Sequence, residues 1–385
     1  MLAKYLLPLP VAHSILHTSV GGLPMITRLV FLAALAVAGL LSLSALAHTG
    51  PEPRFVVVPN HFNRAPRNPS STLPQWSGSF TDLTHKTIHY TMVGTDPSKT
   101  NTSTTVPVVL VPIKMVYGSQ NGNMTFDPHH KLSNGRSVVQ NTLVSPVFES
   151  GIDFVQGGVD LGNTQYIDAY QRGNFWAAVQ THSGYHVLLG TPTVLLERTI
   201  TVTAAEGKVI NNPFAAGRVG TMVISDFDAK LQSLIHYLRA HINPGVLPVF
   251  LTYDIFLTES GSCCIGGYHS AEGGPPGGQT YAYATYVDSV GSFAQDVSLL
   301  SHEIGEWMDD PFIDNNVNCY NHPLMEVGDP LEKKPNYGGY PYTLNGFTYN
   351  LQSLVFIGYF GAPRSGRVNN WLSFQNDEPT VCPGQ

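Results

Sequence analysis

One stretch decides the fold: Asp296-Val-Ser-Leu-Leu-Ser-His302-Glu303-Ile-Gly-Glu306-Trp-Met-Asp309-Asp310-Pro311. Its apolar residues recur every three to four positions, so the spacing predicts a helix with one buried stripe. A capping box formed by Ser292 and Gln295 would begin this helix, and Pro311 would end it. The helix is therefore the element from which the function is argued.

The polar side of this helix carries the residues of a metal motif. His302, Glu306 and Asp309 fall one turn apart, opposite the apolar stripe. In H-E-x-x-H metallopeptidases two histidines bind zinc, and the glutamate after the first histidine is the general base. Here the motif is H-E-x-x-E, and zinc accepts glutamate oxygen. It predicts that His302 and Glu306 bind zinc, with Glu303 as general base. A helix with a solvated polar face is the competing interpretation.

The charge pattern around the motif favours the metal site. From Ala240 to Glu332 the chain has many aspartates and glutamates but no lysine or arginine. Ordinary solvated surfaces mix the two signs of charge. Crowded carboxylates repel one another, and a bound cation offsets this repulsion.

A catalytic zinc ion usually has three protein ligands and a water molecule. Glu326 is our first choice for the third ligand, because a glutamate about two dozen residues beyond the first histidine is the third ligand of gluzincin metallopeptidases. Asp310 is second, since metzincin-like sites take a ligand shortly beyond the helix. Asp329 is third, or it would orient His302 from outside the ligand set. A β-turn over residues 326–329 is the competing interpretation.

These motifs resemble a known family. The run His302-Glu-Ile-Gly-Glu306-x-x-x-Asp310-Pro311, followed by Glu326-x-x-Asp329, is similar to a pattern of secreted zincin-like proteins. The plant EXORDIUM or phosphate-induced family carries a similar stretch after a Cys-Gly-[FY]-His segment, whose counterpart here is Cys264-Ile-Gly-Gly-Tyr268-His269. The resemblance covers about residues 257–329 and departs at Met308-Asp309, where the pattern has a hydroxyl residue.

The resemblance implies a zincin-like fold, and the chain as a whole indicates the α+β class: a mixed or antiparallel sheet, an active-site helix and many loops. The first interpretation is a secreted zinc-dependent hydrolase, a peptidase. His269 or Tyr268 would steady the oxyanion. The predicted strand at 280–287 would pair with an extended polypeptide substrate.

Two alternatives stay open at this point. The chain could be a non-catalytic extracellular or cell-wall-associated binding protein on a zincin-like scaffold. It could instead hold a structural Ca²⁺ ion, which oxygen ligands suit and His302 does not.

The N-terminal region has the pattern of a secretory signal peptide. Met25-Ile-Thr-Arg28 precedes an apolar run from Leu29 to Leu41, and Ala45-Leu-Ala47 fits a cleavage site. We expect translation to start at Met25, cleavage after Ala47 and a secreted protein, extracellular or periplasmic. The apolar run is short for a membrane span, and no later segment is longer. The formal net charge of -7 argues against nucleic-acid binding.

The remaining chain is expected to form an N-terminal α+β lobe, residues 48–245, and a zincin-like lobe, residues 246–385. Alternation and apolar runs predict strands at 86–93, 104–117, 246–258 and 280–287, and periodicity predicts helices at 165–180 and 226–241. Prolines in 104–117 suggest an edge strand. The glycine-rich stretch 261–278 is expected to be a loop outside the core.

Four cysteines in an exported chain suggest two disulfides. A bridge between the adjacent Cys263 and Cys264 would be strained. We therefore expect one of them to join Cys319 and the other to join Cys382. A thiolate metal site is the competing interpretation, without C-x-x-C spacing to support it.

Overall fold

The computed structural model describes residues 56, 58–60 and 71–382. The predicted signal peptide, residues 1–47, lies outside the described residues, and so does its cleavage site. Residues Pro51–Gln385 form one compact unit. Within the described ranges no helix combines the length and the apolar character that a membrane crossing needs.

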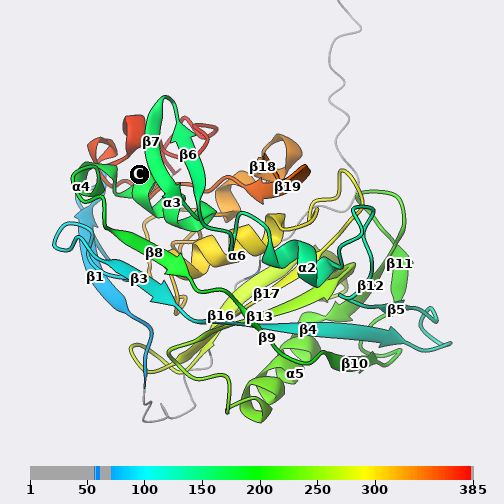
Figure 1. Cartoon of the computed structure of the whole chain (residues 1–385). Coiled ribbons are helices and arrows are strands. Elements are labelled where there is room, and N and C mark those ends of the chain that lie inside the picture. The colour runs from blue at the N-terminus through cyan, green and yellow to red at the C-terminus, as the bar shows by residue number, and fades with distance from the viewer. Residues whose placement is uncertain (1–55, 57, 61–70, 383–385) are drawn as a thin grey trace, which may run out of the picture. The chain divides into compact units, whose positions relative to one another are not determined.

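A seven-stranded mixed sheet is the centre of this unit (Figure 1). Its order is β10-β4-β13-β17-β16, and β5 and β9 also pair with β4. Neighbours are parallel except for β5 and the edge strand β16, which runs antiparallel to β17. The strands are β4 (Val108–Tyr117), β5 (Thr125–Phe126), β9 (Thr193–Val194), β10 (Arg198–Val202), β13 (Leu247–Tyr253), β16 (Gly267–Glu272) and β17 (Gln279–Tyr286).

The smaller sheets and the helices surround this sheet, so the predicted α+β class is confirmed. One sheet has four strands in the order β11-β12-β14-β15: β11 (Val209–Asn211), β12 (Arg218–Val223), β14 (Ile255–Glu259) and β15 (Ser262–Ile265). Four pairs are β1 (Gln75–Thr81) with β2 (Thr87–Val93), β3 (Ser103–Val106) with β8 (His186–Leu189), β6 (Ile152–Gln156) with β7 (Val159–Thr164), and β18 (Gly339–Leu344) with β19 (Phe347–Gln352). The α-helices are α2 (Val138–Leu143), α3 (Tyr166–Asn174), α4 (Trp176–Val179), α5 (Ile224–Tyr237) and α6 (Ser298–Asp309).

The long strand β4 lies inside the main sheet, so the prediction of an edge position is wrong. Pro112 is tolerated because it lies where pairing with β13 ends and pairing with β10 begins at Ile113. The single strand predicted at 246–258 is divided into two strands, β13 and β14. They are separated at Asp254, which has a φ of 54°. Because β13 pairs with β4, the predicted lobe boundary at 245/246 runs through one sheet.

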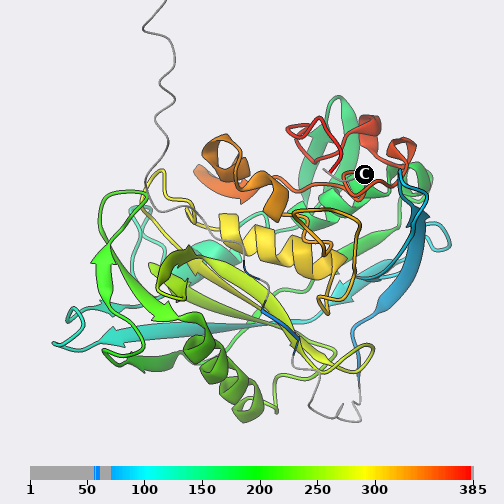
Figure 2. The same cartoon turned by 180° about the vertical axis from the view of Figure 1, so that it is seen from behind.

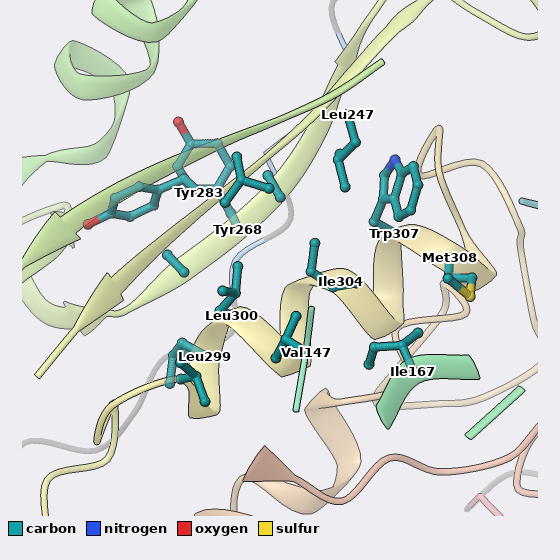
Figure 3. Packing of buried hydrophobic residues seen from close by; sticks show 14 of the residues in the cluster. Val147, Ile167, Leu247, Tyr268, Tyr283, Leu299, Leu300, Ile304, Trp307 and Met308 are labelled. Carbon is teal, nitrogen blue, oxygen red and sulfur yellow. The ribbon is translucent and has the colours of Figure 1, made fainter. Parts of the chain in front are cut away.

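Helix α6 lies across one face of the main sheet, and α5 packs on the opposite face (Figures 1 and 2). The alternation along β17 explains this arrangement. Ala282 and Ala284 leave room for α6, whereas Tyr281 and Tyr283 point towards α5, where the Tyr283 ring lies 4.6 Å from that of Phe227. Figure 3 shows the apolar residues of α6 packed between the sheet and the α3 segment.

The start of α6 differs from the prediction. The helix begins at Ser298, and Ser292 and Gln295 do not form its capping box. Instead, the Gln295 side chain accepts a hydrogen bond from the backbone N–H of Gly291 at 2.8 Å. Asp296 adopts a φ of 44° immediately before the helix. Its end at Asp309, two residues before Pro311, agrees with the prediction.

The glycine-rich stretch 261–278 is not a loop as predicted, because it contains the strands β15 and β16. Two of its glycines, Gly266 and Gly267, serve close packing. A Cβ atom at Gly266 would lie 3.0 Å from Leu299, and one at Gly267 would lie 2.6 Å from Glu303 Oε1, so both glycines let α6 approach the sheet. Only the segment between β16 and β17 is irregular, and it carries the glycine and proline run of the sequence.

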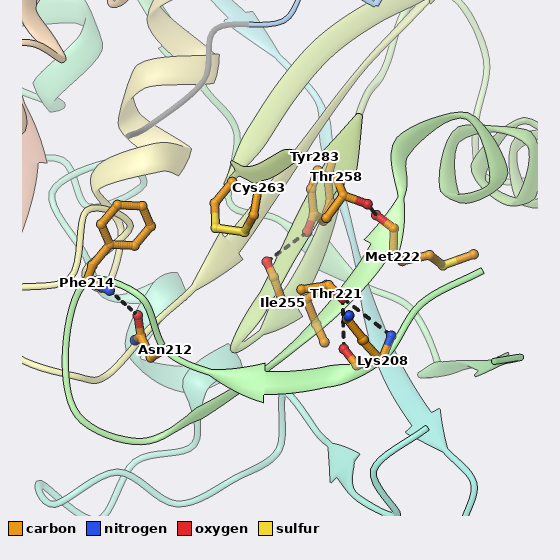
Figure 4. Close-up of a disulfide and its surroundings, with 10 residues drawn as sticks. Lys208, Asn212, Phe214, Thr221, Met222, Ile255, Thr258, Cys263 and Tyr283 are labelled. Atoms are coloured by element: carbon orange, nitrogen blue, oxygen red, sulfur yellow. Dashed lines mark hydrogen bonds between the residues drawn. A yellow bond between two sulfur atoms is a disulfide. The ribbon is translucent and has the colours of Figure 1, made fainter. Parts of the chain in front are cut away.

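The predicted disulfide pairing is wrong. Cys263 is bonded to Cys264 on β15, opposite Thr258 of β14 (Figure 4), and Cys319 is bonded to Cys382 with a Cα–Cα distance of 5.7 Å. Cys319 and Cys382 belong to loops, whereas Cys263 and Cys264 are adjacent residues of β15. The Cys319–Cys382 bridge joins the segment after α6 to the last described residue.

A short N-terminal segment lies against the edge strand β16. The Ser270 hydroxyl donates a hydrogen bond to the backbone oxygen of Val58 at 3.0 Å, and the Asn60 amide donates to that of Phe312 at 3.2 Å. Val58 and Asn60 are buried.

Candidate metal centre

A small cavity of about 20 Å³ lies between α6, the edge strand β16 and the segment that follows Met325. This volume accommodates one or two water-sized spheres. Among the described residues that line the cavity there are two histidines and five carboxylates, and no lysine or arginine. The seven ionisable residues are His269, His302, Glu303, Glu306, Glu326, Asp329 and Glu332.

The orientation of His302 is fixed by a buried glutamine. Gln352 donates through Nε2 to the backbone oxygen of Gly328 at 3.0 Å, so its amide oxygen faces His302. That oxygen accepts from His302 Nδ1 at 2.9 Å. Nε2 therefore points into the cavity, where Glu306 Oε2 lies 3.0 Å away. Burial alone would lower the pKa of His302, but Glu306 and its neighbours raise it well above the usual value, so without a metal ion Nε2 holds a proton. A bound cation would replace that proton and take the Nε2 lone pair. Gly328 permits this position of the His302 ring, since a Cβ there would lie 2.4 Å from Nδ1.

His269 presents its other nitrogen to the same cavity. Its Nε2 lies 3.0 Å from the backbone oxygen of Asp310, and a carbonyl only accepts, so Nε2 carries the proton. In the neutral ring the Nδ1 lone pair then faces three carboxylates. The distances from Nδ1 are 3.7 Å to Glu303 Oε2, 3.8 Å to Glu306 Oε2 and 3.9 Å to Glu326 Oε2.

Glu306 lies between the two histidines. Its Oε1 accepts hydrogen bonds from the backbone N–H groups of Gly328 at 3.1 Å and Asp329 at 3.3 Å. Its Oε2 faces both imidazole rings. Burial alone would raise the pKa of Glu306, but the adjacent His302 and the hydrogen bonds hold it below the usual value. Glu306 is therefore the carboxylate of the cluster that is best stabilised as an anion.

Burial raises the pKa values of three other carboxylates of the cavity, Glu326, Asp329 and Glu332. Burial and repulsion by Glu306 raise the pKa values of Glu326 and Asp329 well above the usual range. Burial raises the pKa of Glu332 to about 8. One oxygen each of Glu326 and Glu332 is buried without a hydrogen-bond partner. Such a cavity takes up protons or cations to offset its negative charge.

Glu303 faces the cavity between the two histidines, with Oε1 4.0 Å from His302 Nε2. Burial raises its pKa above the usual value, which brings this carboxylate nearer to neutral pH. A raised pKa suits a general base that accepts and returns a proton.

The ligand atoms form two groups that share Glu306. One group is His302, Glu306 and Asp329, and the other is His269, Glu306 and Glu326. Within each group the ligand atoms lie within 4.8 Å of one another. Nitrogen and carboxylate oxygen of this kind fit zinc and related divalent ions. Asp329, our third choice from the sequence, is thus the carboxylate that joins His302, and Glu326 joins His269.

Several residues expected near the metal lie elsewhere. The Asp310 carboxylate accepts hydrogen bonds from the backbone N–H groups of Asp314 and Asn315. The Tyr268 hydroxyl donates to Asp228 of α5 at 2.9 Å, on the opposite side of the sheet from His269. Asp309 accepts from Tyr170 at 2.8 Å and also from Gln171, which ties α6 to α3.

The sequence analysis missed Glu332, Gln352 and the two glycines that line or support the cavity. Glu332 belongs to the same acidic segment as Glu326, but nothing in its spacing singles it out. Gln352 is far along the chain and reaches His302 because β19 lies beside α6. No short-range pattern carries that information.

Comparisons with protein-family models, curated proteins and solved structures find no match for this chain. The function is therefore argued from the residues of the cavity.

Proposed function

We propose that the protein is a secreted zinc-dependent hydrolase that acts on polypeptides, built on a zincin-like scaffold. The single observation that carries this proposal is the pairing of His302 with Glu306 on α6. Gln352 turns His302 Nε2 towards Glu306 Oε2 at 3.0 Å, in a cavity with no lysine or arginine among its described lining residues. Asp329 Oδ1, 3.7 Å from His302 Nε2, is the third ligand.

Zinc held by these three residues would supply Lewis acidity towards a water molecule and a substrate carbonyl. Glu303 is placed beside this position, and its raised pKa lets it take a proton from the water and return it to the leaving amine. The burial of Glu303, 3 % exposed, limits competition from bulk solvent. These are the roles that the H-E-x-x-E motif predicts for its first two residues.

The path of a polypeptide substrate differs from our expectation. Strand β17 is paired on both sides, with β13 and β16, and cannot add another strand. The edge strand is β16, which is antiparallel to β17 and carries His269 into the cavity. An extended substrate would add to β16, in the manner of strand augmentation. The segment around Val58 lies against this edge and would have to move aside.

The test is zinc content measured beside peptide hydrolysis for the full secreted chain. We expect His302→Ala to lose the zinc ion that His302, Glu306 and Asp329 bind. His241→Ala, at an exposed histidine, should keep the wild-type zinc content. Glu303→Gln should keep zinc and lower turnover by about 10²- to 10⁴-fold, the usual effect of a positioned acid–base group. Glu306→His restores the commoner ligand and should retain zinc.

The control for Glu303→Gln is Glu149→Gln, at a half-buried glutamate that does not line the cavity. Full zinc in His302→Ala would contradict the metal site. Zinc that disappears with His302 but turnover that is indifferent to Glu303 would instead identify a metal-binding protein without this chemistry.

A further inference from the structure

We propose that the cavity holds a second divalent cation, bound by His269, Glu306 and Glu326, so that the metal centre is dinuclear with Glu306 as the bridge. This inference rests on the proposed function for the first cation, which His302, Glu306 and Asp329 bind. It assigns a role to His269 and Glu326, which have none if His302 binds a single ion.

His269 presents a ligand atom to the cavity. The backbone oxygen of Asp310 fixes the proton on Nε2, so Nδ1 of the neutral ring faces the cavity as a ligand atom. A histidine whose second nitrogen donates to a backbone carbonyl is the usual arrangement of a metal ligand. His269 on β16 is thus arranged like His302 on α6. In each ring, one nitrogen is hydrogen-bonded to an oxygen and the other faces the cavity.

Glu326 carries a buried oxygen without a hydrogen-bond partner. Glu326 is 6 % exposed, and its Oε2 has no hydrogen-bond partner although it lines the cavity. An unsatisfied buried carboxylate oxygen costs several times more than an ordinary missing hydrogen bond, so such atoms are paired or bind metal. This oxygen lies 3.9 Å from His269 Nδ1, a separation that one cation between the two atoms spans.

Glu306 Oε2 lies between the two histidine nitrogens. It lies 3.0 Å from the first histidine nitrogen and 3.8 Å from the second. Its partner Oε1 is already held by two backbone N–H groups, so Oε2 is the oxygen available to both cations. In two-metal sites the ions lie about 3.5–4 Å apart and commonly share ligands, a spacing that this shared oxygen permits.

Charge supports the same conclusion. With all five carboxylates of the cavity wall ionised, one divalent ion leaves three negative charges to be offset by protons, whereas two ions leave one. The segment from Ala240 to Glu332, which carries all seven ionisable residues of the cavity, contains no lysine or arginine. Each position offers one imidazole nitrogen and carboxylate oxygens, a set that suits Zn²⁺, Co²⁺ or Mn²⁺.

The test counts ions on the full chain after removal of metal and titration with Co²⁺ and, separately, Zn²⁺. We expect two ions per wild-type chain, and magnetic coupling between the two Co²⁺ ions in electron paramagnetic resonance. Glu326→Gln preserves the shape of the side chain and should reduce the count from two to one and abolish the coupling. His269→Ala should do the same, while His241→Ala should keep both ions.

The outcomes separate the two proposals. One ion in the wild type that disappears in His302→Ala and persists in Glu326→Gln overturns the second position and leaves the proposed function intact. Two ions in both Glu326→Gln and His269→Ala also overturn it. A wild-type chain that binds no Co²⁺ or Zn²⁺ refutes the proposed function itself. Circular dichroism of each variant establishes that a lost ion does not reflect a lost fold, and Glu326→Gln carries the test if His269→Ala does not fold.

Discussion

Replacing Gln352 with methionine tests the idea that this residue prepares His302 for metal. Methionine keeps the length of the side chain but removes the amide oxygen that accepts from His302 Nδ1 at 2.9 Å. Without that acceptor, the tautomer with its lone pair on Nε2 loses its advantage. The affinity for zinc should fall, although Gln352 itself touches no metal.

The size of the effect follows from the contacts of His302 Nδ1. A buried donor that loses its partner costs about 1–3 kcal/mol, or roughly 5- to 150-fold in affinity. Glu332 Oε1 lies 3.4 Å from the same nitrogen and can replace the lost acceptor. We therefore expect about tenfold weaker zinc binding for Gln352→Met alone and about 100-fold for Gln352→Met combined with Glu332→Gln.

The assay is competition for zinc against a chromophoric chelator, with ¹⁵N chemical shifts of the His302 imidazole as a direct report of the tautomer. Gln180→Met is the matched control, since Gln180 is exposed and remote from the cavity lining. Wild-type zinc affinity in both Gln352→Met and the double variant, with folded protein, would refute the reasoning about the tautomer.

Three further predictions concern catalysis, pH and the disulfide. In Gly267→Ala the new Cβ would lie 2.6 Å from Glu303 Oε1 and 2.9 Å from the backbone oxygen of Tyr283, so both the carboxylate and the strand must shift. Turnover should fall about 10²-fold with zinc retained, whereas Gly366→Ala, at an open position, should be neutral. Wild-type turnover in Gly267→Ala would contradict the role of this packing. Burial raises the pKa of Asp254 to about 7, so the folded state keeps its proton while the unfolded state loses it, and wild-type stability falls as pH rises from about 4 to 7. Asp254→Asn should therefore gain up to about 4 kcal/mol relative to the wild type between pH 4 and pH 8 in urea unfolding, and equal pH dependence of the two proteins would exclude this cause. Cys382→Ser opens a loop of 63 residues and should lower the free energy of unfolding by about 2–4 kcal/mol; an unchanged urea midpoint would show that the bridge does not stabilise the fold.

Local patterns predicted the elements of this fold better than their arrangement. The helix at 298–309 and the strand at 279–286 were found because apolar periodicity and alternation are properties of neighbouring residues. The sequence analysis could not place β4 inside the sheet, because its partners β10 and β13 are distant in the chain. Glycines at 266 and 267 indicated a loop, yet they serve close approach to α6, a requirement that only the tertiary structure imposes.

The candidate site divides in the same way. Helical spacing predicted that His302, Glu303 and Glu306 lie close together, because residues about one turn apart share a side of the helix. The order of the remaining carboxylates was not predictable, since Glu326 and Asp329 are separated by only two residues yet face different histidines. Their assignment depends on how the segment folds over α6, which no spacing rule describes.

The Cys319–Cys382 bridge has a consequence for how the protein matures. In chain order Cys382 follows every residue of the candidate metal centre, and it is bonded to the segment that runs between α6 and Glu326. The ribosome therefore synthesises all these carboxylate residues before the Cys319–Cys382 disulfide can form. The acidic segment is therefore complete before this bridge forms, and the bridge itself requires an oxidising compartment. A chain that stays reduced would lack this crosslink, and the segment between α6 and Glu326 would then be joined to the C-terminal region by non-covalent contacts alone.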